Sequence, residues 1–420
     1  MTAPNRAIQH STEPADGPGP GPIGVLPSQQ LRLALAKNWI TTSGPYRIPT
    51  ETMIQPASMD LHLGDVAWPL RCSFLPDQAS AVTDKVEDLK LAGSDGIDLR
   101  DGAILERNRP YLVPLIEELR LPPGIRAKAN PKSSTGRLDV FTRVITDRNN
   151  RFDEITDGYR GKLYLEIVPR SFAIKVRTSI ALNQLRLVSG DTRMNDEDLD
   201  ALNEEFPLLY VGTHPLRSTE LTLGGGLFLS LDLAGAPGTI VGYRAKRTSL
   251  AIDLTKVRAY AWQDYWEPVY PERGQRVVLE PEDFYLLMSA EAVCIPPSHA
   301  AEMLAYDPTA GELRTHYAGF FDPGFGYSRG KKKQGSRAAL EVRARDVAFM
   351  VEHRQPVCKL AFERMTDIPD VLYGEDLGSN YQGQVSTLSK HFEDQIAGVA
   401  QMTLQTSPTS AERPNPLFRA

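Results

Sequence analysis

The sequence predicts a mainly β protein in which two similar domains follow each other along the chain, with a few short helices. Strand-like segments, such as residues 164–168, 172–176 and 275–279, are separated by Gly and Pro turns at a spacing of about ten residues. The 420 residues are 41% hydrophobic and 24% charged, which supplies enough apolar surface for two domain cores. An internal repeat divides the chain into two halves.

Two segments are predicted to be helices and two to be tails. Residues 27–38 have Ser28 as the candidate cap, and residues 195–206 begin with acidic residues that suit the positive end of a helix dipole. Residues 1–22 end in alternating Gly and Pro, and residues 403–420 are rich in Ser, Thr and Pro. Such compositions cannot bury enough apolar surface to offset the entropy lost on ordering. We therefore expect a disordered N-terminal tail over 1–22 and a flexible C-terminal tail over 403–420.

The repeat appears when the chain is compared with itself. Residues 109–123 align with residues 283–297 at a spacing of 174, and residues 165–176 align with residues 340–351 at a spacing of 175. Agreement of two blocks in nearly the same register indicates duplication. We infer a first β domain over 23–215 and a second over 216–402, joined near the 195–206 helix and the glycine run 224–226.

Composition excludes several classes of protein. Lys and Arg number 47 against 53 Asp and Glu, giving a net charge of −6, so a general nucleic-acid binder is not expected. The three cysteines, Cys72, Cys294 and Cys358, form no CxxC pair, which argues against a disulfide framework and a Cys-rich zinc site. No apolar run approaches the roughly 18 residues of a membrane span, and the N-terminus lacks a signal-peptide pattern. We expect a cytoplasmic protein.

The segment Lys132–Arg137, Lys-Ser-Ser-Thr-Gly-Arg, is a candidate anion site. It follows a predicted strand and combines hydroxyl groups, a glycine and two cations. Hydroxyl and backbone N–H groups give directional bonds to phosphate oxygens, and Arg binds them in a forked geometry. A plain surface turn is the alternative interpretation.

Glu166 and Glu341 occupy matching positions of the repeat. Each lies in a strand with apolar neighbours, where partial burial favours the neutral carboxyl and suits it to acid–base chemistry. A solvated strand face is the alternative. Asp322 opens a Pro-Gly turn and could cap it or bind a ligand hydroxyl, and the basic loop 329–337 is either an anion site or a solvated loop. His62, His316 and His353 are most simply structural.

Motifs of zinc-dependent deaminases, metalloproteases, P-loop proteins and serine hydrolases are missing from the sequence. Metal-activated deamination and P-loop hydrolysis therefore lose support.

Four blocks together resemble the dCTP deaminases of the dUTPase-like superfamily, here in a duplicated form. They follow one another in the family's order and span most of residues 25–390. The blocks are Ile54–Gly64, similar to PAS-x-D-L-x-L-G; Lys132–Arg137, similar to [RK]-S-S-x-x-R; Gly161–Glu166 with Asp322–Phe325 and Leu340–Glu341, similar to the D-P-G-W and L-E-F hairpin; and Tyr373 with Asn380–Gln384, similar to the K-Y-Q-G-Q tail.

The resemblance implies two dUTPase-like distorted β-barrels and hydrolytic deamination of dCTP to dUTP without zinc. In the family a Glu acts as general base on the water that attacks cytosine C4, the first Ser holds that water and the Arg stabilises the site. The turn Asp recognises the deoxyribose, and the tail grips the triphosphate with Mg²⁺. Carried over, the catalytic residues are Glu341 or Glu166 with Ser133 and Arg137, and the substrate-binding residues are Lys132, Ser134, Asp322, Tyr373, Tyr381 and Gln384.

Each half retains a different part of the family pattern. The first half lacks the D-P-G-W turn, with Asp153 or Asp157 as replacements for its Asp, and the second half has Tyr306-Asp307-Pro308 where the K/R-S-S motif belongs. We hypothesise one composite site per chain, built from Lys132–Arg137 and the motifs of the second half. A competing hypothesis keeps catalysis in the first domains of a trimer through Glu166. The tail Lys is replaced by Asn380, for which the Lys331–Lys333 loop is a conceivable substitute.

Other functions remain open. A dUTP pyrophosphatase or a bifunctional deaminase and pyrophosphatase has the same fold, and a non-catalytic dNTP-binding regulatory protein would explain the eroded motifs. The expected partner is dCTP, with no nucleic acid and no membrane. Both a homotrimer and a monomer with an internal pseudo-dimer are compatible with the sequence.

Overall fold

The structure is a computed structural model. It describes residues 22–46, 53–91, 93, 95–236, 238–304, 313–315, 319–328, 335–344, 346–374, 377, 381–384 and 386–393. Apart from Pro22, the predicted tails 1–22 and 403–420 lie outside the described residues. So do His316, Asn380, Tyr306-Asp307-Pro308 and the Lys331–Lys333 loop.

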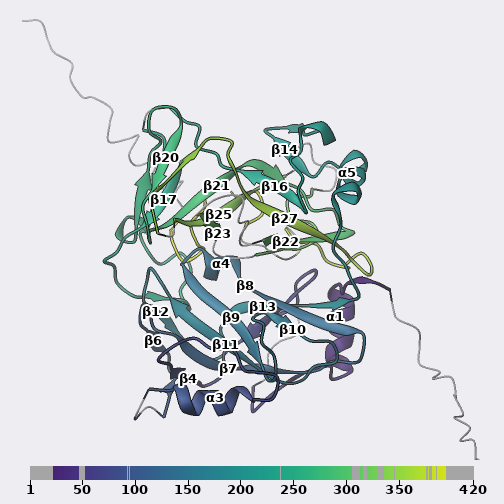
Figure 1. The fold of residues 1–420 in the computed structure, drawn as a ribbon, viewed down its shortest axis with the longest axis vertical. Coiled ribbons are helices and arrows are strands. Elements are labelled where there is room, and N and C mark those ends of the chain that lie inside the picture. Colours follow the sequence, from purple (N-terminus) through teal and green to yellow (C-terminus); the bar gives the residue numbers. More distant parts are fainter. Residues whose placement is uncertain are drawn as a thin grey trace, which may run out of the picture.

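The first domain is mostly β, and its segments pair in antiparallel sheets (Figure 1). In chain order its elements are β1 (Gly24–Val25), α1 (Ser28–Ala36), β2 (Ile40–Thr42), β3 (Met59–His62), β4 (Val66–Pro69), α3 (Val82–Leu89), β5 (Ile97–Asp98), β6 (Ala103–Leu105), β7 (Tyr111–Arg120), β8 (Ile125–Pro131), α4 (Ser133–Gly136), β9 (Val140–Thr146), β10 (Glu154–Ile155), β11 (Arg160–Pro169), β12 (Ile174–Val176) and β13 (Ala181–Ser189).

The second domain repeats this mostly β pattern. Its elements are α5 (Asp196–Glu205), β14 (Leu209–Val211), β15 (His214–Pro215), η1 (Ser218–Glu220), β16 (Leu227–Ser230), β17 (Gly242–Ala245), β18 (Ile252–Asp253), η2 (Trp262–Asp264), β19 (Trp266–Val269), β20 (Arg276–Leu279), β21 (Phe284–Val293), β22 (His299–Leu304), β23 (Leu313–Thr315), β24 (Phe320–Phe321), β25 (Ser336–Ala344), β26 (Phe349–Glu352) and β27 (Pro356–Arg364).

Each domain encloses its core between two sheets. In the first domain one sheet has the order β1-β13-β8-β10 and the other β5-β4-β7-β11-β9. Leu185 and Ala127 of the former pack in one apolar cluster with Val113 and Leu165 of the latter. The second domain is built likewise from β16-β27-β22-β24 and the sheet that contains β21 and β25. The prediction of a mainly β, two-domain fold is confirmed.

Strand register confirms the internal repeat. Glu166 on β11 lies opposite Leu112 on β7, and Glu341 on β25 lies opposite Leu286 on β21. Leu112 and Leu286 are 174 residues apart, the spacing at which the two blocks align. The duplicated halves therefore share backbone pairing as well as sequence.

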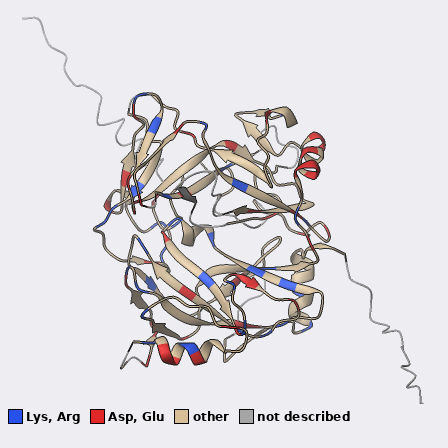
Figure 2. Cartoon of the chain, viewed as in Figure 1, with Lys and Arg blue, Asp and Glu red and all other residues tan. Residues whose placement is uncertain are grey.

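The junction between the domains lies around α5. Asn195 caps this helix by accepting a 2.8 Å hydrogen bond from the Asp198 N–H, and acidic residues fill its first turn, as predicted (Figure 2). Residues 209–215, placed by the sequence in the first domain, form β14 and β15, and β14 pairs with β21 of the second. The other helix differs from expectation, because Ser28 is its first residue and not its cap. The Ser28 hydroxyl instead contacts Asp370.

Two segments of the second half pack onto the first domain. Strand β18 extends the sheet formed by β12 and β6, and Leu388 and Phe392 join the first-domain core. Residues 381–384 and 386–393, here called the C-terminal arm, thus end against the opposite domain. Figure 1 shows α4 between the two domains, facing the strands of the second.

Candidate active site

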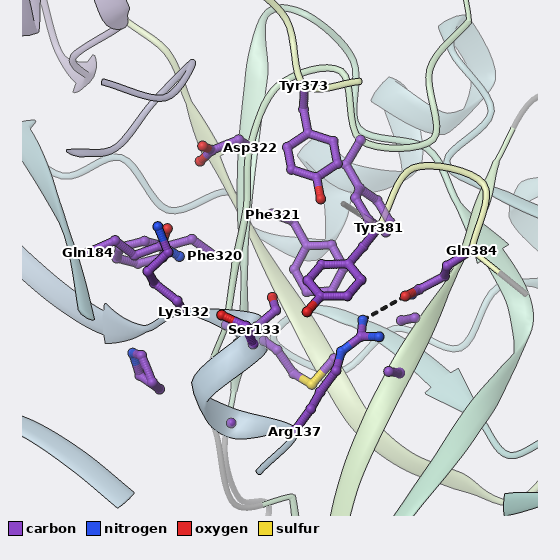
Figure 3. Close-up of a pocket in the computed structure, with 18 of the residues that line it drawn as sticks. Lys132, Ser133, Arg137, Gln184, Phe320, Phe321, Asp322, Tyr373, Tyr381 and Gln384 are labelled. Carbon is purple, nitrogen blue, oxygen red and sulfur yellow. Dashed lines mark hydrogen bonds between the residues drawn. The ribbon is translucent and has the colours of Figure 1, made fainter. Parts of the chain in front are cut away.

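A pocket of about 200 Å³ lies between the α4 turn and the sheet of the second domain (Figure 3). Both domains and the arm contribute to its wall. The lining residues include nine of the ten site residues predicted from the sequence: Lys132, Ser133, Ser134, Arg137, Asp322, Glu341, Tyr373, Tyr381 and Gln384.

The α4 turn presents the first-domain residues to this pocket. Strand β8 ends at Pro131, and Lys132 stays extended before the chain turns into four helical residues. The Lys132 N–H and the Thr135 hydroxyl both donate to the carbonyl of Leu182 on β13, each at 2.9 Å. This anchorage fixes the turn, so that Ser133, Ser134 and Arg137 line one wall of the pocket.

Glu341 enters the pocket from β25 and lies directly against the α4 turn. A Cβ atom built on Gly136 would lie 2.7 Å from Glu341 Oε2 and 2.8 Å from Oε1, so this close approach requires glycine. Burial raises the pKa of the Glu341 carboxyl to about 8, and the nearby Arg137 opposes this shift while Asp139 adds to it. Among the described residues, none hydrogen-bonds the carboxylate. Glu341 can therefore exchange a proton near neutral pH.

Arg137 is buried and held by the C-terminal arm. Its Nη2 donates to Gln384 Oε1 at 2.6 Å, its Nη1 donates to the carbonyls of Thr387 and Leu388, and its guanidinium lies 3.8 Å from the centre of the Tyr381 ring (Figure 3). These contacts satisfy most of the guanidinium and fix it beside Glu341. The arm thus completes the wall around the first-domain motif.

Asp322 also depends on both domains. Its Oδ1 accepts a 2.8 Å hydrogen bond from the guanidinium of Arg186 on β13, and its Oδ2 accepts one of 3.1 Å from the Ser58 hydroxyl. Arg186 is fully buried and stacks on the Phe320 ring at 4.0 Å. The first domain therefore orients the turn carboxylate of the second.

The turn that follows Asp322 positions Tyr373. Gly324 has a φ of +96°, and a Cβ there would lie 2.9 Å from the backbone N of Tyr373. Only glycine fits this combination of left-handed backbone and close approach. The Tyr373 N–H donates to the Pro323 carbonyl at 2.9 Å, and burial raises the pKa of the Tyr373 hydroxyl. Tyr373 thus reaches the pocket as a neutral hydrogen-bonding group.

Comparison with known proteins identifies the family. The model of the 2'-deoxycytidine 5'-triphosphate deaminase N-terminal domain matches residues 22–191, and that of the C-terminal domain matches residues 195–392. The chain belongs to the dCTP deaminase family. Membership in this family makes it a hydrolase of nucleotide metabolism that deaminates dCTP.

A solved structure supports the assignment to the dCTP deaminase family. The chain is similar to 2'-deoxycytidine 5'-triphosphate deaminase from Agrobacterium tumefaciens, with 41% sequence identity and a TM-score of 0.74, over 82% of this chain and 99% of that chain. Among curated proteins, no sequence matches the chain. Within the described residues, no helix has the length and apolar character to cross a membrane. The cytoplasmic location stays a prediction.

Glu166, the other candidate base of the dCTP deaminase motif, lies away from the pocket. It is fully buried, and its Oε2 accepts hydrogen bonds of 2.9 and 2.5 Å from Nε and Nη2 of Arg143. The proposed replacements for the turn Asp also lie elsewhere. Asp153 accepts from the Val144 N–H and Asp157 from the Gly124 N–H. Glu166, Asp153 and Asp157 are thus bonded to groups of the first domain and do not line the pocket.

Several lining residues escaped the sequence analysis, including Gln184, Phe320, Phe321 and Lys390. The two residues before Asp322 are aromatic, which could have indicated a stacking surface. Gln184 and Lys390 carry no comparable signal, because they reach the pocket only through the packing of β13 and the arm.

Proposed function

We propose that this pocket hydrolyses dCTP to dUTP and ammonia without zinc, with Glu341 as the general base. The observation that supports this proposal is the placement of one buried carboxyl, with its pKa raised to about 8, against the turn that carries Ser133 and Arg137, in a pocket formed by both domains. A group with a pKa near the working pH can accept and return a proton in one catalytic cycle.

The proposed reaction begins with a water held by the Ser133 hydroxyl. Glu341 takes a proton from this water while the water oxygen bonds to C4 of cytosine. Glu341 then passes the proton to the exocyclic nitrogen, and the C4–N bond breaks to release ammonia. The second water proton ends on N3 of the uracil ring, so the atoms balance. Arg137, fixed by the arm, stabilises the ionised Glu341 at the start of the cycle.

The other lining residues are proposed to bind substrate. Asp322 accepts a hydrogen bond from the deoxyribose hydroxyl, and Lys132 and Ser134 bind phosphate oxygens. Tyr373, Tyr381 and Gln384 close the pocket over the nucleotide.

Mg²⁺ is proposed to enter with the triphosphate and to neutralise part of its charge. Among the described residues, no group of three or more His, Cys, Asp or Glu side chains is placed to hold a metal ion. The carboxylate of Asp322 is already bonded to Arg186 and Ser58. These contacts fit a cation carried by the phosphates, with the protein supplying hydroxyl and cationic groups around it.

The test is turnover of dCTP by the purified full chain with Mg²⁺, following dUTP, dUMP and ammonia by chromatography. Zinc removal beforehand should leave the rate unchanged. Glu341→Gln should lower kcat by about 100- to 10,000-fold, the range for loss of a general base. Glu166→Gln is the matched control and should retain most turnover.

Loss of turnover only in Glu166→Gln would refute the assignment. Formation of dUMP and pyrophosphate would add a pyrophosphatase activity, whereas tight binding of dCTP without product would favour a regulatory protein.

A further inference from the structure

Lys390 lies in the wall of the same pocket and has no role in the function proposed so far. It belongs to the C-terminal arm, where its N–H donates to the Tyr381 hydroxyl oxygen at 3.3 Å and its carbonyl accepts from the Arg258 N–H at 3.0 Å. Two residues before it, Leu388 is buried in the first-domain core. The backbone of Lys390 is therefore fixed at the pocket by contacts on both sides.

The neighbouring cations of the pocket already have partners. Lys132 forms an ion pair with Asp60, and Arg137 is bonded to Gln384 and two backbone carbonyls of the arm. Among the described residues, no carboxylate lies within ion-pair distance of the Lys390 ammonium group.

The surroundings of Lys390 favour an anion. Burial lowers the pKa of Lys390, the nearby Lys132 lowers it further, and Asp60 opposes both effects. Two lysines thus share one close carboxylate, which leaves an excess positive charge at this end of the pocket. An anionic ligand with several oxygens would relieve the repulsion between the two ammonium groups.

We propose that Lys390 binds the triphosphate of the substrate, together with Lys132. This inference rests on the proposed function, since it concerns the same pocket and substrate. The arm then has two tasks: Tyr381 and Gln384 fix Arg137 near Glu341, and Lys390 supplies charge at the phosphate end. Because Lys132 comes from the first domain, the triphosphate bridges the two halves of the chain.

The experiment compares nucleotide binding by Lys390→Gln, Lys390→Arg and the unaltered chain. Binding of dCTP, dCDP and dCMP is titrated by calorimetry on full-length protein that also carries Glu341→Gln, so that turnover is slow compared with the titration. Lys390→Gln should weaken dCTP binding by about tenfold or more, as expected for loss of a charge-assisted contact. It should leave dCMP binding nearly unchanged, and Lys390→Arg should restore most of the dCTP affinity.

Lys85→Gln serves as the charge-matched control, because Lys85 lies on α3 and is absent from the pocket lining. Its dCTP affinity should equal that of the unaltered chain. Equal weakening of dCTP and dCMP by Lys390→Gln, or no weakening at all, would overturn the proposal. If the chain with Lys390 intact bound none of the three nucleotides, the proposed function itself would fail. That outcome is distinguishable from a failure of the Lys390 proposal alone.

Discussion

Burial of the Glu341 carboxyl lowers the stability of the folded protein above the ordinary pKa of a glutamate. Its pKa rises from an ordinary value of 4.5 to about 8 because the carboxyl is buried. Between these two pH values the unfolded chain ionises at this residue while the folded chain keeps the proton. The folded protein therefore loses stability as pH rises through this range.

Replacing Glu341 by Gln should stabilise the protein in a pH-dependent manner. At pH 8 we expect an increase of about 4 kcal/mol in the free energy of unfolding, and little change near pH 4, where the carboxyl is protonated in both states. Denaturant unfolding at several pH values measures this difference. A gain that did not vary with pH would show that burial of the charge is not its cause.

The same residue sets the pH dependence of turnover. The proposed base must be ionised, so kcat/KM should rise with pH, reach half its maximum near pH 8, the value to which burial raises the Glu341 pKa, and level off about one pH unit higher. Initial rates at low dCTP concentration from pH 5.5 to 9.5 test this. A rate that fell steadily over pH 6–8 would indicate that the protonated carboxyl is the active form.

The α4 turn is short and contacts the Glu341 carboxylate through Gly136. It contains four residues, and Gly136 is the point at which it meets Glu341. The backbone of Gly136 is not left-handed, so alanine is compatible with its conformation. Any effect of an added methyl group would then come from its contact with the carboxylate.

Gly136→Ala is therefore a specific test of the Glu341 position. The added Cβ would stand 2.7 Å from Oε2, which forces the carboxylate to move. We expect kcat to fall by at least about tenfold, because a small displacement of a catalytic group is costly, while the melting temperature changes little. Steady-state kinetics and thermal melts measure the two quantities. Unaltered kcat would contradict the close packing of turn and carboxyl.

Helix α3 explains why the two glutamates differ. In the second domain, the face that carries Leu286 and Phe284 packs on the first-domain core. The equivalent face of the first domain, marked by Leu112 and Tyr164, is covered by Val82 and Val86 of α3. The sheet face of the second domain is thus covered by the first domain, whereas the equivalent sheet face of the first domain is covered by α3. Glu166 lies opposite Leu112 in the strand register and is fully buried, with Arg143 as its partner.

For the whole molecule, we predict one composite site per chain. Titration of the Glu341→Gln chain with dCTP should give a stoichiometry of one nucleotide per chain, since the Glu166 face is closed by α3. A stoichiometry of two would mean that a second site forms, for example between copies, and would reopen the trimer hypothesis. The oligomeric state stays a prediction.

The two domains are joined by buried ion pairs. Arg186 of the first domain contacts Asp322 at 2.8 Å and Glu363 at 3.2 Å, and Lys128 binds Glu302 and Glu363. Removing one member of such a network leaves buried charge without its partner, which costs about 3–5 kcal/mol. The network thus links the stability of the domain interface to the position of Asp322.

Arg186→Met should lower both the melting temperature and the affinity for dCTP. The matched control is Arg32→Met, because Arg32 and Asp370 form an exposed pair with side chains 42% and 48% accessible. Loss of such a surface pair costs at most about 1 kcal/mol. Thermal unfolding and nucleotide titration compare the variants. Equal effects of the two substitutions would refute a special role for the buried pair.

The sequence by itself determined the β architecture, the duplication and nine of the residues that line the pocket. Strand periodicity and turn residues are local properties, and the repeat is visible in the letters alone. Ser133, Arg137, Asp322 and Glu341 could be named because short motifs keep their order and spacing.

Only the tertiary structure decided which glutamate faces the α4 turn. Glu166 and Glu341 occupy equivalent strand positions, so local sequence cannot separate them. Their difference comes from distant packing: α3 covers Leu112 and Tyr164 and Arg143 pairs with Glu166, whereas Gly136 leaves room for Glu341. The same holds for Lys390 and Arg186, which reach the site across the domain interface. Contacts between residues far apart in the chain depend on how whole sheets pack, and no spacing along the chain encodes that.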